Sequence, residues 1–255
     1  SNNISVILAC LNYEKSCQLS IDSVIKSNSI NNLFKELIIV IGDRKDRNKI
    51  LEKYKNLNNK NFTIKVEISR SGIYAAYNCG LKIAKGEYLL FIGAGEELNS
   101  EISFLSALKK YLKLNLDTYI FNLSFNNKSS FRKLNIKDLK CPPHQTILYS
   151  NKIIKANKIF YDEKLKIYAD AVFTRSYLEL IENFIFYSEA LVDFKDGGLG
   201  NSIKGTRYRI FDQIRIYFTY RRNIQGLLLL IRYLIIETLF FSNKFLENIL
   251  IKIKK

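Results

Sequence analysis

The hydrophobic positions in the first part of the chain form short runs separated by polar segments. Apolar runs rich in β-branched residues occupy residues 4–9, 36–42, 62–69 and 87–93. The segments after the first three runs place apolar residues three or four positions apart, which is the period of a helix. Strands that alternate with helices form a parallel sheet, and strands that are apolar throughout are covered on both faces. We therefore expect an α/β fold with a mostly parallel central sheet flanked by helices.

The pattern changes after residue 115. Residues 117–125, 145–150 and 183–194 read as shorter strands, and a helix is expected around residues 170–181. This half is expected to add mixed or antiparallel strands and a second substrate pocket. We predict one domain over residues 1–203, with halves 1–115 and 116–203, and a separate segment over residues 204–255. Ligands of open α/β sheets bind outside the carboxyl ends of the strands, so the loops after Ala9, Ile41, Ile68 and Ile92 should build the site.

Residues 204–255 are helical and basic. They carry eleven Lys and Arg residues against Asp212, Glu237 and Glu247, a surplus of eight in a chain whose net charge is +16. Residues 210–218 contain one apolar stripe and residues 245–253 contain another. Residues 227–241 are apolar nearly all round, except at Arg232 and Glu237. These two charges favour an interfacial or buried helix over a transmembrane one. Two interpretations stay open: C-terminal helices that pack on the core, and a helical pair that lies on an anionic membrane surface.

Composition excludes several classes of protein. The chain is 47% hydrophobic and 25% charged with two prolines, which is typical of a folded protein. Four scattered cysteines and one histidine match no zinc-site spacing, and the first residues show no export signal, so we expect a cytoplasmic protein with reduced thiols. Aromatic residues lie in apolar stripes instead of alternating with Lys and Arg, so we predict no nucleic-acid partner. A homodimer stays open.

Three segments together carry a family resemblance: "SVILACLNYEKS", "ELIIVIGDRKDRN" and "SGIYAAYNCGLKIAKGEYLLFIGAGEEL". In order and spacing they resemble the inverting glycosyltransferases of family 2, whose GT-A fold binds a nucleotide-sugar, and the likeness covers about residues 4–200. "PPHQTILYS", "FYDEKLKIYADAVFTRSYL" and "DFKDGGLGNS" resemble a bacterial subgroup that builds surface polysaccharide. The resemblance implies transfer from a nucleotide-sugar donor, a UDP-sugar first, to a glycan or lipid-linked acceptor at the inner face of a bacterial membrane.

The metal-binding motif of that family is degenerate in this chain. Where the family has approximately Asn/Asp-x-Asp-Asp, this sequence has Gly93, Ala94, Gly95 and Glu96. Mg²⁺ and Mn²⁺ prefer carboxylate oxygens, and the usual two aspartates are missing. Three interpretations follow: a metal-independent transferase without a cofactor, a catalytically inactive binding module with the same fold, and a transferase in which Glu96 still holds Mn²⁺ or Mg²⁺. We take the first as the main hypothesis.

In a metal-independent transferase, cationic side chains and backbone N–H groups would meet the charge of the leaving diphosphate. The candidate cations are Arg70, Lys204, Arg207 and Arg209. The resemblance implies further donor-site positions: Cys10, Asn12, Asp43, Tyr74 and Asn78. The structural alternatives are loop capping for Asn12 and core packing for Tyr74 and Asn78.

Inverting transfer needs a base beside the acceptor hydroxyl. Asp170 falls where the subgroup has its aspartate, and it is our candidate, with pairing to Arg175 or a lysine as the structural alternative. His144 is the alternative base, with acceptor or phosphate contact favoured for it and for Gln145. Asp162 matches a neighbouring motif position, and helix capping is the expectation there.

Overall fold

The first four apolar runs form the parallel part of a central sheet. β1 (Ile4–Cys10) pairs in parallel with β2 (Phe34–Ile41) and with β4 (Tyr88–Gly93), and β2 pairs in parallel with β3 (Thr63–Ile68). The connections are the helices α1 (Lys15–Asn31), α2 (Arg44–Tyr54) and α3 (Ile73–Ile83), with a 3-10 turn at Lys55–Leu57 after α2. The predicted alternation of strands and helices is confirmed.

The computed structural model describes residues 3–69, 71–125, 128–130, 142–194, 203–220, 226–228 and 230–239. The chain divides into two compact units. Ser1–Tyr161 and Asp170–Asp196 form the first, and Asp162–Ala169 and Gly197–Lys255 form the second. The short segment that precedes Asp170 thus belongs with the C-terminal residues.

The second half of the first unit extends the sheet with strands of both directions. Its elements are β5 (Glu97–Leu98), α4 (Ile102–Tyr111), a 3-10 turn at Leu112–Leu114, β6 (Thr118–Phe125), β7 (Lys128–Ser130), a 3-10 turn at His144–Thr146, β8 (Ile147–Ser150), α5 (Asn151–Ala156), α6 (Ala169–Leu178) and β9 (Phe184–Phe194). The strand order is β3-β2-β1-β4-β8-β6-β9-β5, with β7 beside β6. β8 is antiparallel to β4 and to β6, whereas β9 runs parallel to β6. The expected mixed half is therefore present.

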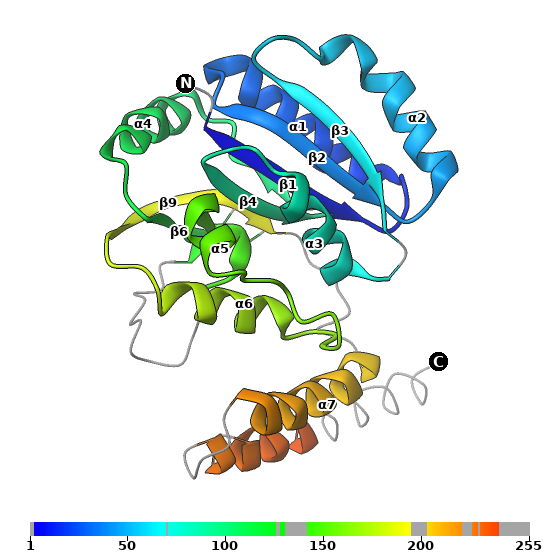
Figure 1. Ribbon diagram of the computed structural model, residues 1–255, viewed down its shortest axis with the longest axis vertical. Helices are drawn as coiled ribbons and strands as arrows, with labels where there is room; N and C mark the ends of the chain where they lie inside the picture. The colour runs from blue at the N-terminus through cyan, green and yellow to red at the C-terminus, as the bar shows by residue number, and fades with distance from the viewer. Residues whose placement is uncertain are drawn as a thin grey trace, which may run out of the picture. The chain divides into compact units, whose positions relative to one another are not determined.

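The two faces of the sheet build two apolar layers. Val6 and Leu8 of β1 belong to the same core cluster as Ile21 of α1 and Leu105 of α4. Ile7 points to the other face, because strand neighbours alternate, and there it meets α3, where a Cβ on Gly80 would approach its side chain to 2.4 Å. α1 and α3 therefore cover opposite faces, and α2 lies along β3 (Figure 1).

The second unit is helical. Its helix α7 spans Ile203–Tyr220, and residues 226–228 and 230–239 are also helical. In the part of the chain that the structure describes, no helix is both long enough and apolar enough to span a membrane.

Candidate functional site

Backbone hydrogen bonds join the loops at the carboxyl ends of β1, β2 and β3. The Gly42 N–H donates to the Leu11 carbonyl oxygen at 3.1 Å, and the Ser69 N–H donates to the Ile41 carbonyl oxygen at 3.0 Å. A Cβ at position 42 would lie 2.7 Å from the Leu11 oxygen, so this contact requires glycine. Leu11 itself is 77% exposed directly beyond β1. An apolar side chain is thus held in solvent at the edge where ligands of such sheets bind.

The polar candidates on these loops have local partners. Asp43 is the N-cap of α2, and its carboxylate accepts a hydrogen bond from the Lys45 N–H at 2.6 Å. The exposed Asn12 amide donates to the Glu14 carboxylate at 3.3 Å. Cys10 ends β1 and is buried. Asn12 and Asp43 therefore lie at the expected edge, and their contact with a donor stays a prediction.

The loop after β4 is held against α1 by serine side chains. Gly95 adopts φ +94°, a conformation that glycine accepts without strain. Its N–H donates to the Ser20 hydroxyl at 2.9 Å and to the Ser16 carbonyl at 3.1 Å, and the Ser20 hydroxyl donates to the Gly93 carbonyl at 3.2 Å. The Gly95 amide is already used within the protein. The glycine at position 95 serves the turn itself, which weakens the expectation that this amide binds a diphosphate.

Glu96 folds back over the same loop. One carboxylate oxygen accepts the Gly93 N–H at 2.7 Å, and the other accepts the side-chain amide of Gln145 at 2.7 Å. Burial of the carboxyl group raises the pKa of Glu96 to about 7, and the negative charge of Asp170 acts in the same direction against these two hydrogen bonds. The loop after β4 and the turn after Pro143 thus meet at Glu96.

Asp170 lies in the first turn of α6, where its carboxylate is half-buried and accepts the Ala171 N–H at 2.8 Å. Burial raises the pKa values of Glu96, Tyr77 and Tyr161, and the negative charge of Asp170 adds to each of these shifts, so Asp170 lies within electrostatic range of the residues at the end of β4. The structure therefore brings together three sequence candidates from distant segments: Glu96, Gln145 and Asp170. A carboxyl group with a pKa near 7 beside a second carboxylate is a typical arrangement for acid–base chemistry.

His144 lies in an aromatic cluster. Its ring packs edge-on against Tyr77 and Tyr161, with ring centroids 5.1 and 5.9 Å away, and Nδ1 lies 3.3 Å from the Tyr161 hydroxyl. Complete burial lowers the pKa of His144 to about 3, so the imidazole is neutral at pH 7. This placement favours packing over proton transfer, and an acceptor contact of His144 stays a prediction.

Two further donor candidates support the same cluster. The Asn78 amide donates to the Tyr161 carbonyl and accepts the Tyr161 N–H, both at 2.9 Å. Tyr74 is buried and stacks on the Tyr161 ring, with centroids 5.7 Å apart. Both residues are on α3 and hold Tyr161 against it, which is the structural alternative given for them.

The predicted cations lie either outside the described residues or in the second unit. Arg70 lies outside the described residues, as does the side chain of Lys204. Arg207 and Arg209 belong to the second unit, where the Arg207 guanidinium lies 5.6 Å from the Phe211 ring centroid and the buried Arg209 pairs with Glu237 at 2.7 Å. Their predicted contact with phosphate is not tested by these positions.

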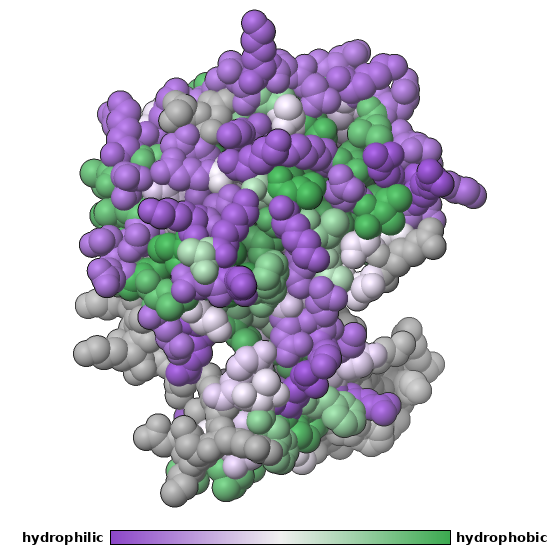
Figure 2. Space-filling model, in the orientation of Figure 1, coloured by the Kyte–Doolittle hydropathy of each residue, from purple (hydrophilic) through white to green (hydrophobic). Residues whose placement is uncertain are grey.

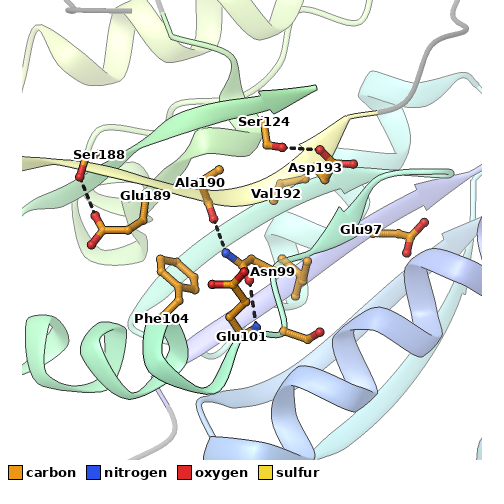
Figure 3. A pocket seen from close by; sticks show the side chains of 12 residues that line it. Glu97, Asn99, Glu101, Phe104, Ser124, Ser188, Glu189, Ala190, Val192 and Asp193 are labelled. Atoms are coloured by element: carbon orange, nitrogen blue, oxygen red, sulfur yellow. Dashed lines mark hydrogen bonds between the residues drawn. The ribbon is translucent and has the colours of Figure 1, made fainter. Parts of the chain in front are cut away.

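A separate hollow of about 550 Å³ lies beside β5 and β9 (Figure 3). The Asn99 amide bonds the Ala190 carbonyl at 3.0 Å across it, and Phe104 of α4 covers one side. Four carboxylates line it: Glu97, Glu101, Glu189 and Asp193. The negative charges of these carboxylates would repel a diphosphate. This favours the strand ends over the hollow as the donor site.

Comparison with known proteins now decides the family. The family model of glycosyl transferase family 2 matches residues 5–181. The chain belongs to this family. The structure of S. aureus TarS 1–349 in complex with UDP matches with a TM-score of 0.63 and 21% identity, over 84% of this chain and 65% of that one. Its complex with UDP-GlcNAc matches with the same score and identity, over 84% and 66%.

The longer S. aureus TarS structure matches with a TM-score of 0.62 and 22% identity, over 84% of this chain and 40% of that one. This chain therefore spans less than two thirds of TarS, and at these identities the likeness shows the fold. No curated protein sequence matches significantly. The predicted family and GT-A fold are confirmed.

At the end of β4, the residues that the structure describes do not fit the divalent metal centre that the family resemblance implies. In the described residues, no group of three or more His, Cys, Asp or Glu side chains could hold a metal ion. Both oxygens of Glu96 already accept hydrogen bonds from the protein, and hard cations need several oxygen ligands. We derive no catalytic step through a metal.

Sequence reasoning missed residues that hold the loop after β4 and the aromatic cluster in place. Ser16 and Ser20 lie four positions apart on α1, under the loop after β4. Two serines four positions apart on the helix after the first strand share one side of that helix, and this spacing is the signal that could have found them. Tyr161 gave no such signal, because its partners Asn78 and Tyr74 are more than 80 positions away in the chain.

Proposed function

We propose that the protein is an inverting glycosyltransferase that moves a sugar from a nucleotide-sugar to a glycan or lipid-linked acceptor in bacterial surface polysaccharide synthesis. The observation that carries this proposal is the meeting of Glu96, Gln145 and Asp170 at the end of β4. In an α/β sheet this edge is where ligands bind. Membership of family 2 supplies the reaction class.

Asp170 is the proposed general base. Its carboxylate takes the proton of the acceptor hydroxyl, the oxygen attacks the anomeric carbon, and the bond to the nucleoside diphosphate breaks on the opposite face. The configuration of the sugar is thereby inverted. Tyr77 and Tyr161 are buried within electrostatic range of Asp170.

Glu96 is proposed to organise the site and not to hold a metal. Below pH 7 its carboxyl group is largely protonated, which spares Asp170 a neighbouring negative charge. The charge of the leaving diphosphate is then met by cations of the chain, and the candidates are Arg70, Lys204, Arg207 and Arg209. Fixed positive charge can replace a metal there, because both act by electrostatic attraction to the developing anion.

A UDP-sugar is the proposed donor. S. aureus TarS, which shares the fold, has been solved with UDP and with UDP-GlcNAc. The exposed Leu11 offers an apolar surface directly beyond β1, and a flat nucleobase could pack against it.

A thermal-shift panel with UDP-, GDP-, CMP- and dTDP-sugars, each with and without EDTA, tests this proposal. UDP-sugars should raise Tm equally in both conditions, and UDP-GlcNAc should release UDP in EDTA when a glycan acceptor is added. Loss of binding in EDTA with recovery in Mn²⁺ would show a metal-dependent enzyme. Binding of no nucleotide-sugar at all would instead support the inactive binding module.

A further inference from the structure

α7 buries charged residues and exposes aromatic ones. Positions 205, 209, 212 and 216 are four, three and four residues apart and so share one side of the helix, and all four are buried, although two of them are Arg209 and Asp212. The opposite side presents Phe211 and Phe218, which are 55% and 56% exposed. An ordinary surface helix shows the reverse pattern.

The helical residues 226–228 and 230–239 repeat this inversion. Glu237 is buried, whereas six large aliphatic side chains are exposed: Leu227, Leu228, Ile231, Ile235, Ile236 and Leu239. The two helical segments are joined through the buried Arg209, whose Nε donates to Oε1 of Glu237 at 2.7 Å and whose Nη2 lies 2.7 Å from the other carboxylate oxygen as an ion pair. We call these two segments the C-terminal helix pair. Its charged residues Arg209, Asp212 and Glu237 are buried while many of its large apolar side chains are exposed, and Figure 2 shows apolar residues at the surface of this part of the molecule.

The inner polar contacts leave the outer face positively charged. Asp212 accepts hydrogen bonds from the Lys166, Ile167 and Tyr168 N–H groups at 2.6 to 3.0 Å, and Glu237 is paired with Arg209. These are the two acids in the described part of the C-terminal helix pair, and both are turned inward. Arg207 and Arg232 are exposed beside the apolar side chains.

We propose that the outer face of the C-terminal helix pair docks on an anionic lipid surface. Soluble proteins rarely leave such an apolar face uncovered, and aromatic and aliphatic side chains rimmed by arginines are the composition of helices that lie in a membrane interface. A second copy of this chain would present the same positive charge and be repelled, whereas anionic lipids supply both the apolar layer and the opposite charge. The proposal deepens the proposed function, because a lipid-linked acceptor lies in that surface.

Co-sedimentation of the full chain with vesicles tests this docking. Wild-type protein should bind vesicles of phosphatidylglycerol and phosphatidylcholine, and bind pure phosphatidylcholine weakly. The double variant Phe211→Ser/Phe218→Ser should lower partitioning at least about tenfold. Phe160→Ser is the matched control, because Phe160 is 49% exposed in the first unit, and it should bind as the wild type does.

Charge is tested separately. Arg232→Ala should lower binding to anionic vesicles roughly fivefold and leave binding to phosphatidylcholine unchanged. Equal binding of the wild type and the Phe211→Ser/Phe218→Ser variant would overturn the proposal, and so would a dimer in analytical ultracentrifugation that those substitutions dissolve. Nucleotide-sugar binding in solution should be unchanged in all four proteins, so a failure of docking is distinguishable from a failure of the proposed function.

Discussion

The two units of this protein solve burial in opposite ways. In the first, every residue of β1 is buried, and all of them except Ser5 are apolar. The buried Glu36 has three partners: the Ser5 hydroxyl, the Lys85 N–H and the Lys65 ammonium. In the second, the charged side chains of Arg209, Asp212 and Glu237 are buried while large apolar side chains are exposed.

This difference teaches where each unit finds its stability. The first unit removes its own apolar surface from water, which is the main driving force of folding. The second is joined by directional polar contacts, and it leaves large apolar side chains exposed. A unit of the first kind tolerates loss of one polar contact, whereas a unit of the second kind should not.

The largest expected effect is therefore in the second unit. Arg209→Leu leaves Glu237 buried without its ion-pair partner, which should cost about 3–5 kcal/mol of unfolding free energy in that unit. Hydrogen exchange of residues 203–220 and 230–239 would report it. Lys65→Leu is the matched change in the first unit, and since Glu36 keeps two donors it should cost about 1 kcal/mol. Similar losses in both variants would contradict the comparison.

Asp212→Asn should give the next largest loss. Three backbone N–H groups converge on the Asp212 carboxylate, and hydrogen bonds to a charged acceptor are each worth more than neutral ones, so we expect about 2 kcal/mol. The bonded residues 166–168 lead directly into α6 and Asp170. Turnover should fall while the Kd for UDP stays unchanged. If the Kd changes instead, Asp212 acts on the donor side.

A smaller effect is expected at the turn after β4. Gly95→Ala places a Cβ on a residue with φ +94° and should cost roughly 1–2 kcal/mol by urea denaturation. At Gly93 a new Cβ would meet the Glu96 carboxyl group at 3.6 Å, an ordinary contact, so Gly93→Ala should cost less. The reverse order would show that the loop adopts another conformation.

The smallest predicted effect is a change in pH dependence. The raised pKa of Glu96, from 4.5 to about 7, contributes stability that is lost as pH rises through that window. The lowered pKa of His144, from 6.5 to about 3, contributes stability that is lost as pH falls. Between pH 4.5 and 6.5 the two slopes oppose each other. Glu96→Gln should remove the first slope, so its Tm should drop on acidification more steeply than that of the wild type.

Much of the first unit was predictable because its signals are local. The runs at 4–9 and 87–93 are apolar on both faces, and they form β1 and β4 within one residue or so of the expected limits. Asp170 and Glu96 became site candidates through the order of the motifs along the chain. The contact between Glu96 and Gln145 joins residues 49 positions apart, and no local pattern encodes it.

The second unit could not be predicted in the same way. The apolar stripe at residues 210–218 indicates a helix, and α7 confirms it. Which side faces inward depends on Glu237, 28 positions later, and on the N–H groups of residues 166–168. These tertiary partners override the hydrophobic pattern, so the residues that a periodicity argument places inside, such as Phe211 and Phe218, are exposed.

The most direct test of the central claim is to measure UDP binding and sugar transfer side by side in Asp170→Asn. Asparagine keeps the size of the side chain and removes its basicity. The account predicts a Kd for UDP within about twofold of the wild type and a kcat lower by at least about a hundredfold. A variant that binds UDP normally and transfers sugar at a rate close to that of the wild type would contradict it.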